Sequence, residues 1–83
     1  MQPDQIKQLI QSGLPDAQVF VEGDDGQHFT AVIVCPSFAG KTMLQQHKMV
    51  YGTLGNAMQG AIHALSMRTF TPEEWQTAQK SRP

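Results

Sequence analysis

The sequence contains only one cysteine, Cys35, among its 83 residues. A single thiol forms neither an internal disulfide nor a cysteine-rich zinc site, so both classes of small stabilised domain are excluded. This cysteine usage is typical of a reducing compartment, and we expect the protein in the cytoplasm. Cys35 ends an apolar segment and precedes Pro36, a setting in which a thiol is inert. A thiol enzyme would require Cys35 to be exposed and readily ionised.

Charge of either sign is also scarce, with six Lys and Arg against seven Asp and Glu. A domain that binds nucleic acid through its overall field is strongly basic, so this class is not favoured, although local basic patches remain open. The longest purely apolar run is Ala31–Cys35, whereas a bilayer span needs about 20 residues. Charges near the N-terminus occupy the place of a signal peptide's apolar stretch. We therefore expect neither a membrane association nor a leader.

The residues that are present indicate one small folded domain. Forty per cent of them are apolar, which argues against disorder, and the length suits a single core. We expect one domain over residues 1–80 and a disordered tail at 81–83.

Hydrophobic spacing predicts the first three elements. Ile6, Leu9 and Ile10 recur at helical spacing, which favours a helix over residues 2–13. Residues 17–23 are rich in β-branched and aromatic types, as is the segment from 27 or 28 to 35, and the two predict two strands. An Asp-Asp-Gly turn joins them, so they should form an antiparallel hairpin. Both faces of the second strand are apolar, which predicts a central strand covered on part of each face.

The second half of the chain predicts a helix over 41–51, a further short helix at 54–59 where glycines blur the boundaries, and a strand over 62–70. Apolar side chains line one side of the first of these helices, and the methionines at 43, 49, 58 and 67 are typical of core positions. Thr71 followed by Pro72 and Glu74 predicts the start of a last helix. The connection between the second and third strands is long enough for a parallel crossover. The predicted architecture is therefore α+β, in the order α-β-β-α-(α)-β-α, with a three-stranded mixed sheet and helices packed on one face.

Two histidines occupy related positions, because His28 lies at the start of the second strand and His63 lies at the start of the third. If these strands are parallel, both imidazoles start at the same end of the sheet and are able to share a metal ion. The alternative is that each is a solvated or hydrogen-bonded structural side chain. Two ligands make an incomplete site, so a partner would supply the others. Asp24 or Asp25 offers an oxygen ligand, although turn chemistry already explains both.

A nucleic-acid interface is the second candidate site. Gly52 and Gly55 have the GxxG spacing with which KH domains clamp a nucleic-acid backbone. Lys41 and Lys48, together with Arg68, would supply a small basic patch, although a solvated helix face explains the lysines equally well.

The chain resembles the BolA family, in particular the short bacterial proteins of the IbaG or YrbA type. Four stretches carry the resemblance, of which Ile62–Ser66 is the most diagnostic. The others are Val19–Phe29, Phe38–Tyr51 and Thr71–Trp75. The resemblance implies a class II KH-like fold, in agreement with the predicted element order. It also implies a non-enzymatic adaptor that partners a monothiol glutaredoxin in iron–sulfur cluster trafficking or in iron, redox and stress regulation.

The resemblance implies a bridging [2Fe–2S] cluster shared with the glutaredoxin and its bound glutathione. His63 is the first ligand it assigns to this chain, and His28 the second. His47 also belongs to the family pattern, and we interpret it as a helix-packing or partner-contact residue. The isolated chain is then expected to hold no cofactor and to be a monomer or a weak homodimer. The alternative function is a KH-like transcriptional regulator that binds DNA.

Overall fold

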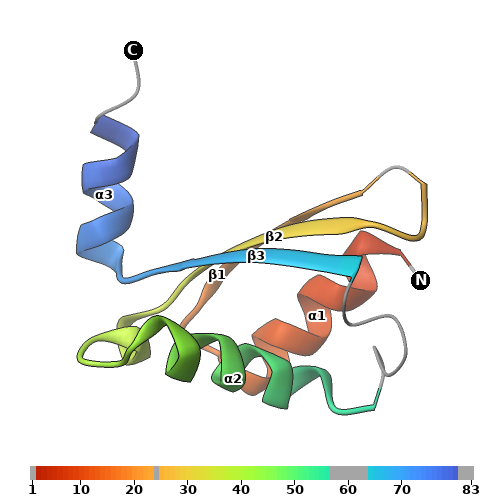
Figure 1. Cartoon of the computed structure of the whole chain (residues 1–83), viewed down its shortest axis with the longest axis horizontal. Coiled ribbons are helices and arrows are strands. Elements are labelled where there is room, and N and C mark those ends of the chain that lie inside the picture. The colour runs from red at the N-terminus through yellow and green to blue at the C-terminus, as the bar shows by residue number, and fades with distance from the viewer. Residues whose placement is uncertain (1, 24, 57–63, 81–83) are drawn as a thin grey trace.

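The computed structural model describes residues 2–23, 25–56 and 64–80. Within these ranges, three α-helices and one short 3-10 helix surround a three-stranded sheet (Figure 1). Along the chain the elements are α1 (Pro3–Gly13), β1 (Gln18–Glu22), β2 (Phe29–Val34), η1 (Pro36–Phe38), α2 (Met43–Leu54), β3 (Leu65–Phe70) and α3 (Pro72–Lys80). This arrangement confirms the predicted α+β fold class. The predicted tail at 81–83 lies outside the described residues.

The sheet places β2 at its centre, as its two apolar faces predicted. β1 pairs with β2 in antiparallel register, with Phe20 opposite Val32. β3 pairs with β2 in parallel register, with Phe29 opposite Leu65. The first residues of β2 and β3 are therefore neighbours at one end of the sheet. β3 begins at Leu65, later than the strand start predicted at residue 62, and residues 62 and 63 lie outside the described residues.

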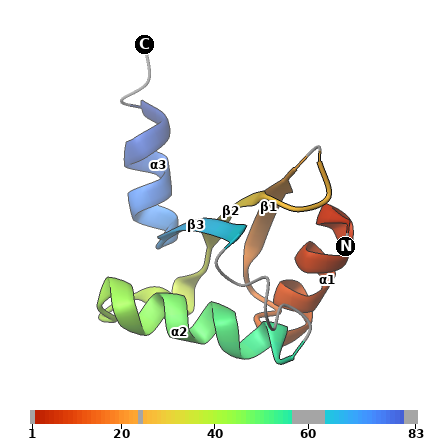
Figure 2. The same ribbon diagram turned by 45° about the vertical axis from the view of Figure 1, so that its right-hand side comes forward.

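α1 and α2 cover one face of the sheet, and the core lies between this face and the two helices (Figure 2). Alternate strand residues point to this face, and Ile6 and Ile10 of α1 pack against them with no exposed surface. Phe38 of η1 is also fully buried. The fully or nearly buried strand residues of this face are Val19, Phe29, Ala31, Ile33 and Leu65.

The last helix, α3, differs from the predicted position because it lies on the opposite side of the sheet (Figure 2). Its Trp75 stacks on Phe20, with ring centroids 5.9 Å apart, and contacts Phe70 at 5.2 Å. Both phenylalanines alternate with core residues in their strands, so they point away from α1 and α2. The helices therefore do not all pack on one face. We call the face that carries Phe20 and Phe70 the outer face.

The buried side of α2 also differs from the prediction. Gln46, Val50 and Leu54 face the core, whereas Met43 and Leu44 are 71% and 64% exposed. Leu44 is two residues from Gln46, which corresponds to about 200° around a helix, so the two cannot share a face. Met49 and Met67 are partly buried, as predicted, and Met58 lies outside the described residues.

Both ends of α2 are shifted from the prediction of 41–51. The helix begins after Thr42, whose hydroxyl accepts a hydrogen bond from the Gln45 backbone at 3.1 Å. It continues to Leu54 and ends at Gly55, whose φ of 55° suits glycine. Of the further helix predicted at 54–59, Leu54 belongs to α2 and residues 55 and 56 form a turn, while residues 57–59 lie outside the described residues. In the part of the chain that the structure describes, no helix has the length and apolar character to cross a membrane.

Candidate functional site at the start of strands β2 and β3

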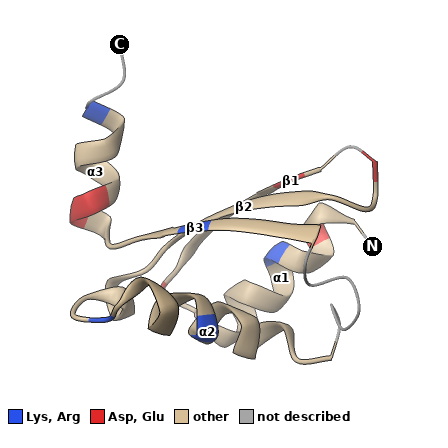
Figure 3. Cartoon of the chain, viewed as in Figure 1, with Lys and Arg blue, Asp and Glu red and all other residues tan. Residues whose placement is uncertain are grey.

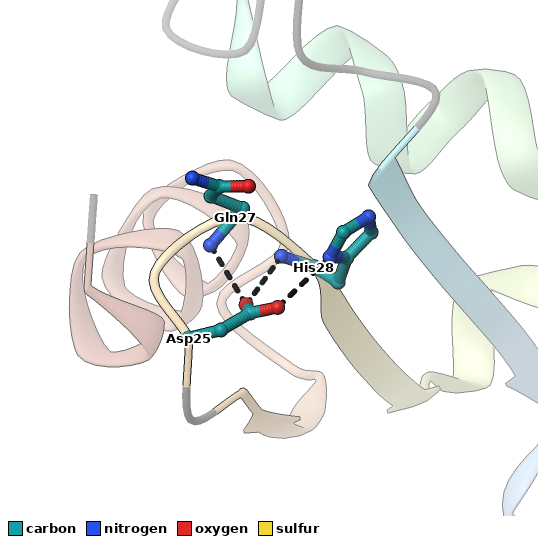
Figure 4. A network of polar contacts seen from close by, with 3 residues as sticks. All are labelled: Asp25, Gln27 and His28. Atoms are coloured by element: carbon teal, nitrogen blue, oxygen red, sulfur yellow. Dashed lines mark hydrogen bonds and ion pairs between the residues drawn. The ribbon is translucent and has the colours of Figure 1, made fainter.

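The loop between β1 and β2 is organised around the carboxylate of Asp25 (Figure 4). Its Oδ1 accepts two backbone hydrogen bonds, from the N–H of Gln27 at 2.9 Å and of His28 at 2.8 Å. Gly26, between donor and acceptor, has a φ of 72°, a conformation that residues with a side chain rarely adopt. The Asp-Gly pair therefore closes the loop by a local side-chain turn.

The second oxygen of Asp25 reaches the imidazole of His28. The distance between Asp25 Oδ2 and His28 Nδ1 is 2.9 Å. This hydrogen bond, followed by the two backbone N–H donors, holds the pKa of Asp25 well below its usual value. The His28 side chain is nevertheless 75% exposed. The site thus presents an accessible imidazole that a carboxylate holds from one side.

An open pocket of about 550 Å³ lies beside this imidazole. It is formed where β1 ends and β2 and β3 begin, and among the described residues it is lined by Glu22, Gly23, His28, Phe29, Thr30, Ala64 and Ser66. The strand starts therefore meet at one rim, as the sequence predicted. His63 directly precedes Ala64 in the sequence but lies outside the described residues, so its pairing with His28 stays a prediction. Within the described ranges, no three His, Cys, Asp or Glu side chains gather as a metal site.

Asp25 is the residue of the candidate site that the sequence prediction undervalued. Turn chemistry was a sufficient explanation for both aspartates of the loop, and Asp24 lies outside the described residues. The structure shows that one carboxylate of Asp25 both closes the turn and contacts His28. The sequence signal for this role is the spacing of two and three residues from Asp25 to Gln27 and His28, because an aspartate commonly accepts hydrogen bonds from backbone N–H groups at these distances along the chain.

Cys35 is 1% exposed and lies at the far end of β2 from His28. Its backbone N–H donates to the carbonyl of Phe70 at 2.9 Å and continues the pairing with β3. The exposed thiol that a cysteine enzyme requires is therefore not found here.

Of the residues of the predicted nucleic-acid interface, Arg68 lies apart from the others, which belong to α2 and its flanking residues. Lys41 and Lys48 are exposed, before and within α2, whereas Arg68 sits on the outer face above the ring of Phe70. Figure 3 shows basic and acidic residues scattered over several elements. Because the sheet lies between Arg68 and the two lysines, the three cations do not form one patch.

The GxxG segment forms the last turn of α2. Gly52 is within the helix and Gly55 ends it, while Leu54 between them is 2% exposed and belongs to the core. His47 is half-buried on the same helix. Its predicted contact with a partner stays a prediction.

Comparison with known proteins identifies the family. The model of the BolA-like protein family matches residues 7–74, and the chain belongs to this family. The Escherichia coli protein named DNA-binding transcriptional regulator BolA is 38% identical over 52 residues, which are 63% of this chain and half of that protein's length. The acid stress protein IbaG of E. coli is 33% identical, with the match covering 90% of this chain and 89% of that protein.

A solved structure agrees with the same assignment. The BolA protein homologue from Coxiella burnetii superposes with a TM-score of 0.80 at 48% identity, covering 92% of this chain and 97% of that one. The fold predicted from the sequence resemblance is therefore confirmed.

Proposed function

We propose that this protein is a non-enzymatic cytoplasmic adaptor that shares a bridging [2Fe–2S] cluster with a monothiol glutaredoxin and its bound glutathione. The cluster is cargo that the two proteins hold together, in trafficking or assembly of clusters or in iron, redox and stress regulation. The observation that carries the proposal is the exposed imidazole of His28, held by Asp25 at the rim where β2 and β3 begin.

The donor chemistry of this rim suits a shared cluster. His28 offers one nitrogen ligand, and the family resemblance assigns a second to His63. Iron in such a cluster is four-coordinate, so thiolates from the partner and from glutathione would complete the set. Ligation by histidine raises the reduction potential relative to four cysteines. A cluster held in this way is suited to transfer or sensing.

Access supports the same proposal. The imidazole is 75% exposed and borders an open pocket rather than a sealed cavity. A ligand set contributed by two proteins requires such a surface, because each protein must approach the metal from its own side. We expect the isolated chain to hold no cluster and to be a monomer or a weak homodimer.

The test mixes the protein with a monothiol glutaredoxin that carries a glutathione-ligated cluster. Visible absorption and circular dichroism are recorded for wild type, His63→Ala and His28→Ala. Gln27→Ala is the matched control, because Gln27 is an exposed neighbour in the same loop. We expect a spectral change with wild type and Gln27→Ala and its loss with either histidine variant. Unchanged spectra with the wild-type protein would refute the proposal, and a change that survives both histidine substitutions would refute the ligand assignment.

The alternative function is DNA binding, because one relative is named a DNA-binding transcriptional regulator. Lys41 and Lys48, with the turn at Gly52 and Gly55, would then contact the phosphate backbone. Binding through phosphates weakens steeply as salt rises. Fluorescence anisotropy with labelled duplex DNA at several salt concentrations, for wild type and a Lys41→Ala, Lys48→Ala double variant, tests it. Equal and salt-independent affinities would remove this alternative.

A further inference from the structure

We propose that Asp25 is a positioning residue that holds His28 in the tautomer protonated on Nδ1, leaving the lone pair of Nε2 free to bind a metal ion. The inference deepens the proposed function and rests on it for the identity of the metal. The tautomer of His28 that it predicts is a property of the free chain, without metal or partner.

The hydrogen bond between the two side chains assigns the proton. An ionised carboxylate only accepts hydrogen bonds, so the contact of 2.9 Å between Asp25 Oδ2 and His28 Nδ1 requires the proton on Nδ1. A neutral imidazole carries one N–H and one lone pair, and the lone pair therefore belongs to Nε2. A free histidine in water prefers the opposite tautomer, so the loop reverses the intrinsic preference.

The carboxylate is itself held in place, which distinguishes this contact from an ordinary surface ion pair. Exposed pairs contribute little because both side chains remain free to move. Here Oδ1 of Asp25 accepts the backbone N–H groups of Gln27 and His28, and these two bonds direct Oδ2 toward the imidazole (Figure 4). The backbone turn thus orients the carboxylate independently of its contact with the imidazole.

This arrangement is the one that metal-binding histidines commonly have. Their second ring nitrogen usually donates to a carboxylate or a carbonyl, which sets the tautomer and the ring orientation. Loss of such a partner typically weakens metal affinity by about 10–100-fold. Asp25 is therefore a positioning residue that acts through His28 and does not itself contact the metal.

The Asp25→Asn variant separates positioning from folding. The single amide oxygen of asparagine is able to keep the two backbone hydrogen bonds, so the turn is retained. Its NH₂ group then faces His28 Nδ1 and, as a donor, requires a lone pair there. The variant should therefore invert the tautomer while the loop keeps its shape. Asp16→Asn, at an exposed aspartate outside this loop, is the matched control for the loss of one negative charge.

The first measurement is the long-range ¹H–¹⁵N correlation spectrum of the imidazoles in the isolated chain, at a pH where they are neutral. We expect the Nδ1–H pattern for His28 in wild type and in Asp16→Asn, and the Nε2–H pattern in Asp25→Asn. The Nε2–H pattern in wild type, or the same tautomer in wild type and Asp25→Asn, overturns the inference. Backbone amide spectra verify that each variant is folded.

The second measurement is a titration with the cluster-loaded glutaredoxin, followed by circular dichroism. Asp25→Asn should need about 10–100-fold more glutaredoxin complex for half of the wild-type change, and Asp16→Asn should match wild type. A wild-type response of Asp25→Asn overturns the positioning role. The two proposals fail differently. A wild-type response of His28→Ala refutes the proposed function's assignment of His28 as a ligand. The tautomer spectra of the free chain test the role of Asp25 in the loop in either case.

Discussion

The geometry of the candidate site depends on one short loop, in which a side chain forms hydrogen bonds with the backbone and with a neighbouring side chain. Asp25 accepts three hydrogen bonds from groups within three residues of it. Such local contacts form without help from the distant core, so the loop is largely determined by its own sequence. The charge of Asp25 is the property that connects its structural and its proposed functional role.

The first prediction concerns acid stability. Because hydrogen bonds lower the pKa of Asp25 in the folded state from an ordinary 3.8, its ionised form stabilises the fold at pH values above that ordinary pKa. This contribution is lost as the pH falls below 3.8 toward the lowered folded-state value. Urea unfolding of wild type should therefore show a decline in this acid range that is smaller in Asp25→Asn. Parallel pH profiles for the two proteins would contradict the assignment.

The second prediction compares two glycines. A Cβ at Gly23 would lie 2.7 Å from the carbonyl oxygen of His28, whereas a Cβ at Gly52 meets nothing within 4 Å. Gly23→Ala should destabilise the fold by about 1–3 kcal/mol, as overpacking does, and should shift the backbone amide resonance of His28. Gly52→Ala should stabilise it by about 0.5–1 kcal/mol, because alanine favours a helix. Urea unfolding measures both, and equal effects would contradict the close approach at Gly23.

At the scale of elements, the side chain of Gln46 joins three parts of the fold. Its Nε2 donates to the carbonyls of Phe38 and Lys41 at 3.2 and 3.0 Å, and its Oε1 accepts from the Thr69 hydroxyl at 2.6 Å. These bonds connect α2 with the η1 loop before it and with β3 beside it. The burial of a glutamine is therefore compensated, since each of its polar atoms has a partner.

The third prediction removes this connection. Gln46→Met keeps a similar volume but leaves the Lys41 carbonyl and the Thr69 hydroxyl without their partner, while the Phe38 carbonyl keeps the N–H of Lys41. This loss should cost about 1–3 kcal/mol in the free energy of unfolding. Gln46→Glu retains the acceptor for Thr69 but loses both donors, and should also destabilise. Gln11→Met, on the exposed side of α1, should change stability by less than about 0.5 kcal/mol. A Gln46→Met variant as stable as this control would contradict the role.

At the scale of the whole molecule, the sheet has two unequal faces. α1, α2 and η1 cover one face with fully buried side chains, whereas the outer face is covered in part by Trp75 of α3. α3 itself has no buried residue. Most of the stability should therefore come from the core face.

The fourth prediction tests this inequality with two phenylalanines. Phe38 has no exposed surface, whereas Phe20 is 48% exposed. Phe38→Ala should lose about 3–5 kcal/mol, a large part of the roughly 4–12 kcal/mol typical of a domain of 83 residues. Phe20→Ala should lose only about 1–2 kcal/mol, from partial burial and one ring contact. Thermal unfolding followed by far-ultraviolet circular dichroism measures both, and a larger loss for Phe20→Ala would contradict the assignment.

The amino-acid sequence alone determined the element order, the central position of β2 and the parallel pairing that brings the starts of β2 and β3 together. These features follow from hydrophobic period, turn residues and the length of one connection, all of which are local in the chain. It also identified His28 as a candidate ligand through its position at a strand start.

Only the tertiary structure decided the partners of the side chains. It turned Met43 and Leu44 outward and buried Gln46, because the contacts of α2 with α1 and β3 select which side of the helix is covered. It placed α3 across the sheet from the other helices, since Phe20 and Phe70 offer Trp75 an apolar surface there. Hydrophobic spacing shows that a segment has an apolar side, but which surface covers that side depends on residues far away in the chain.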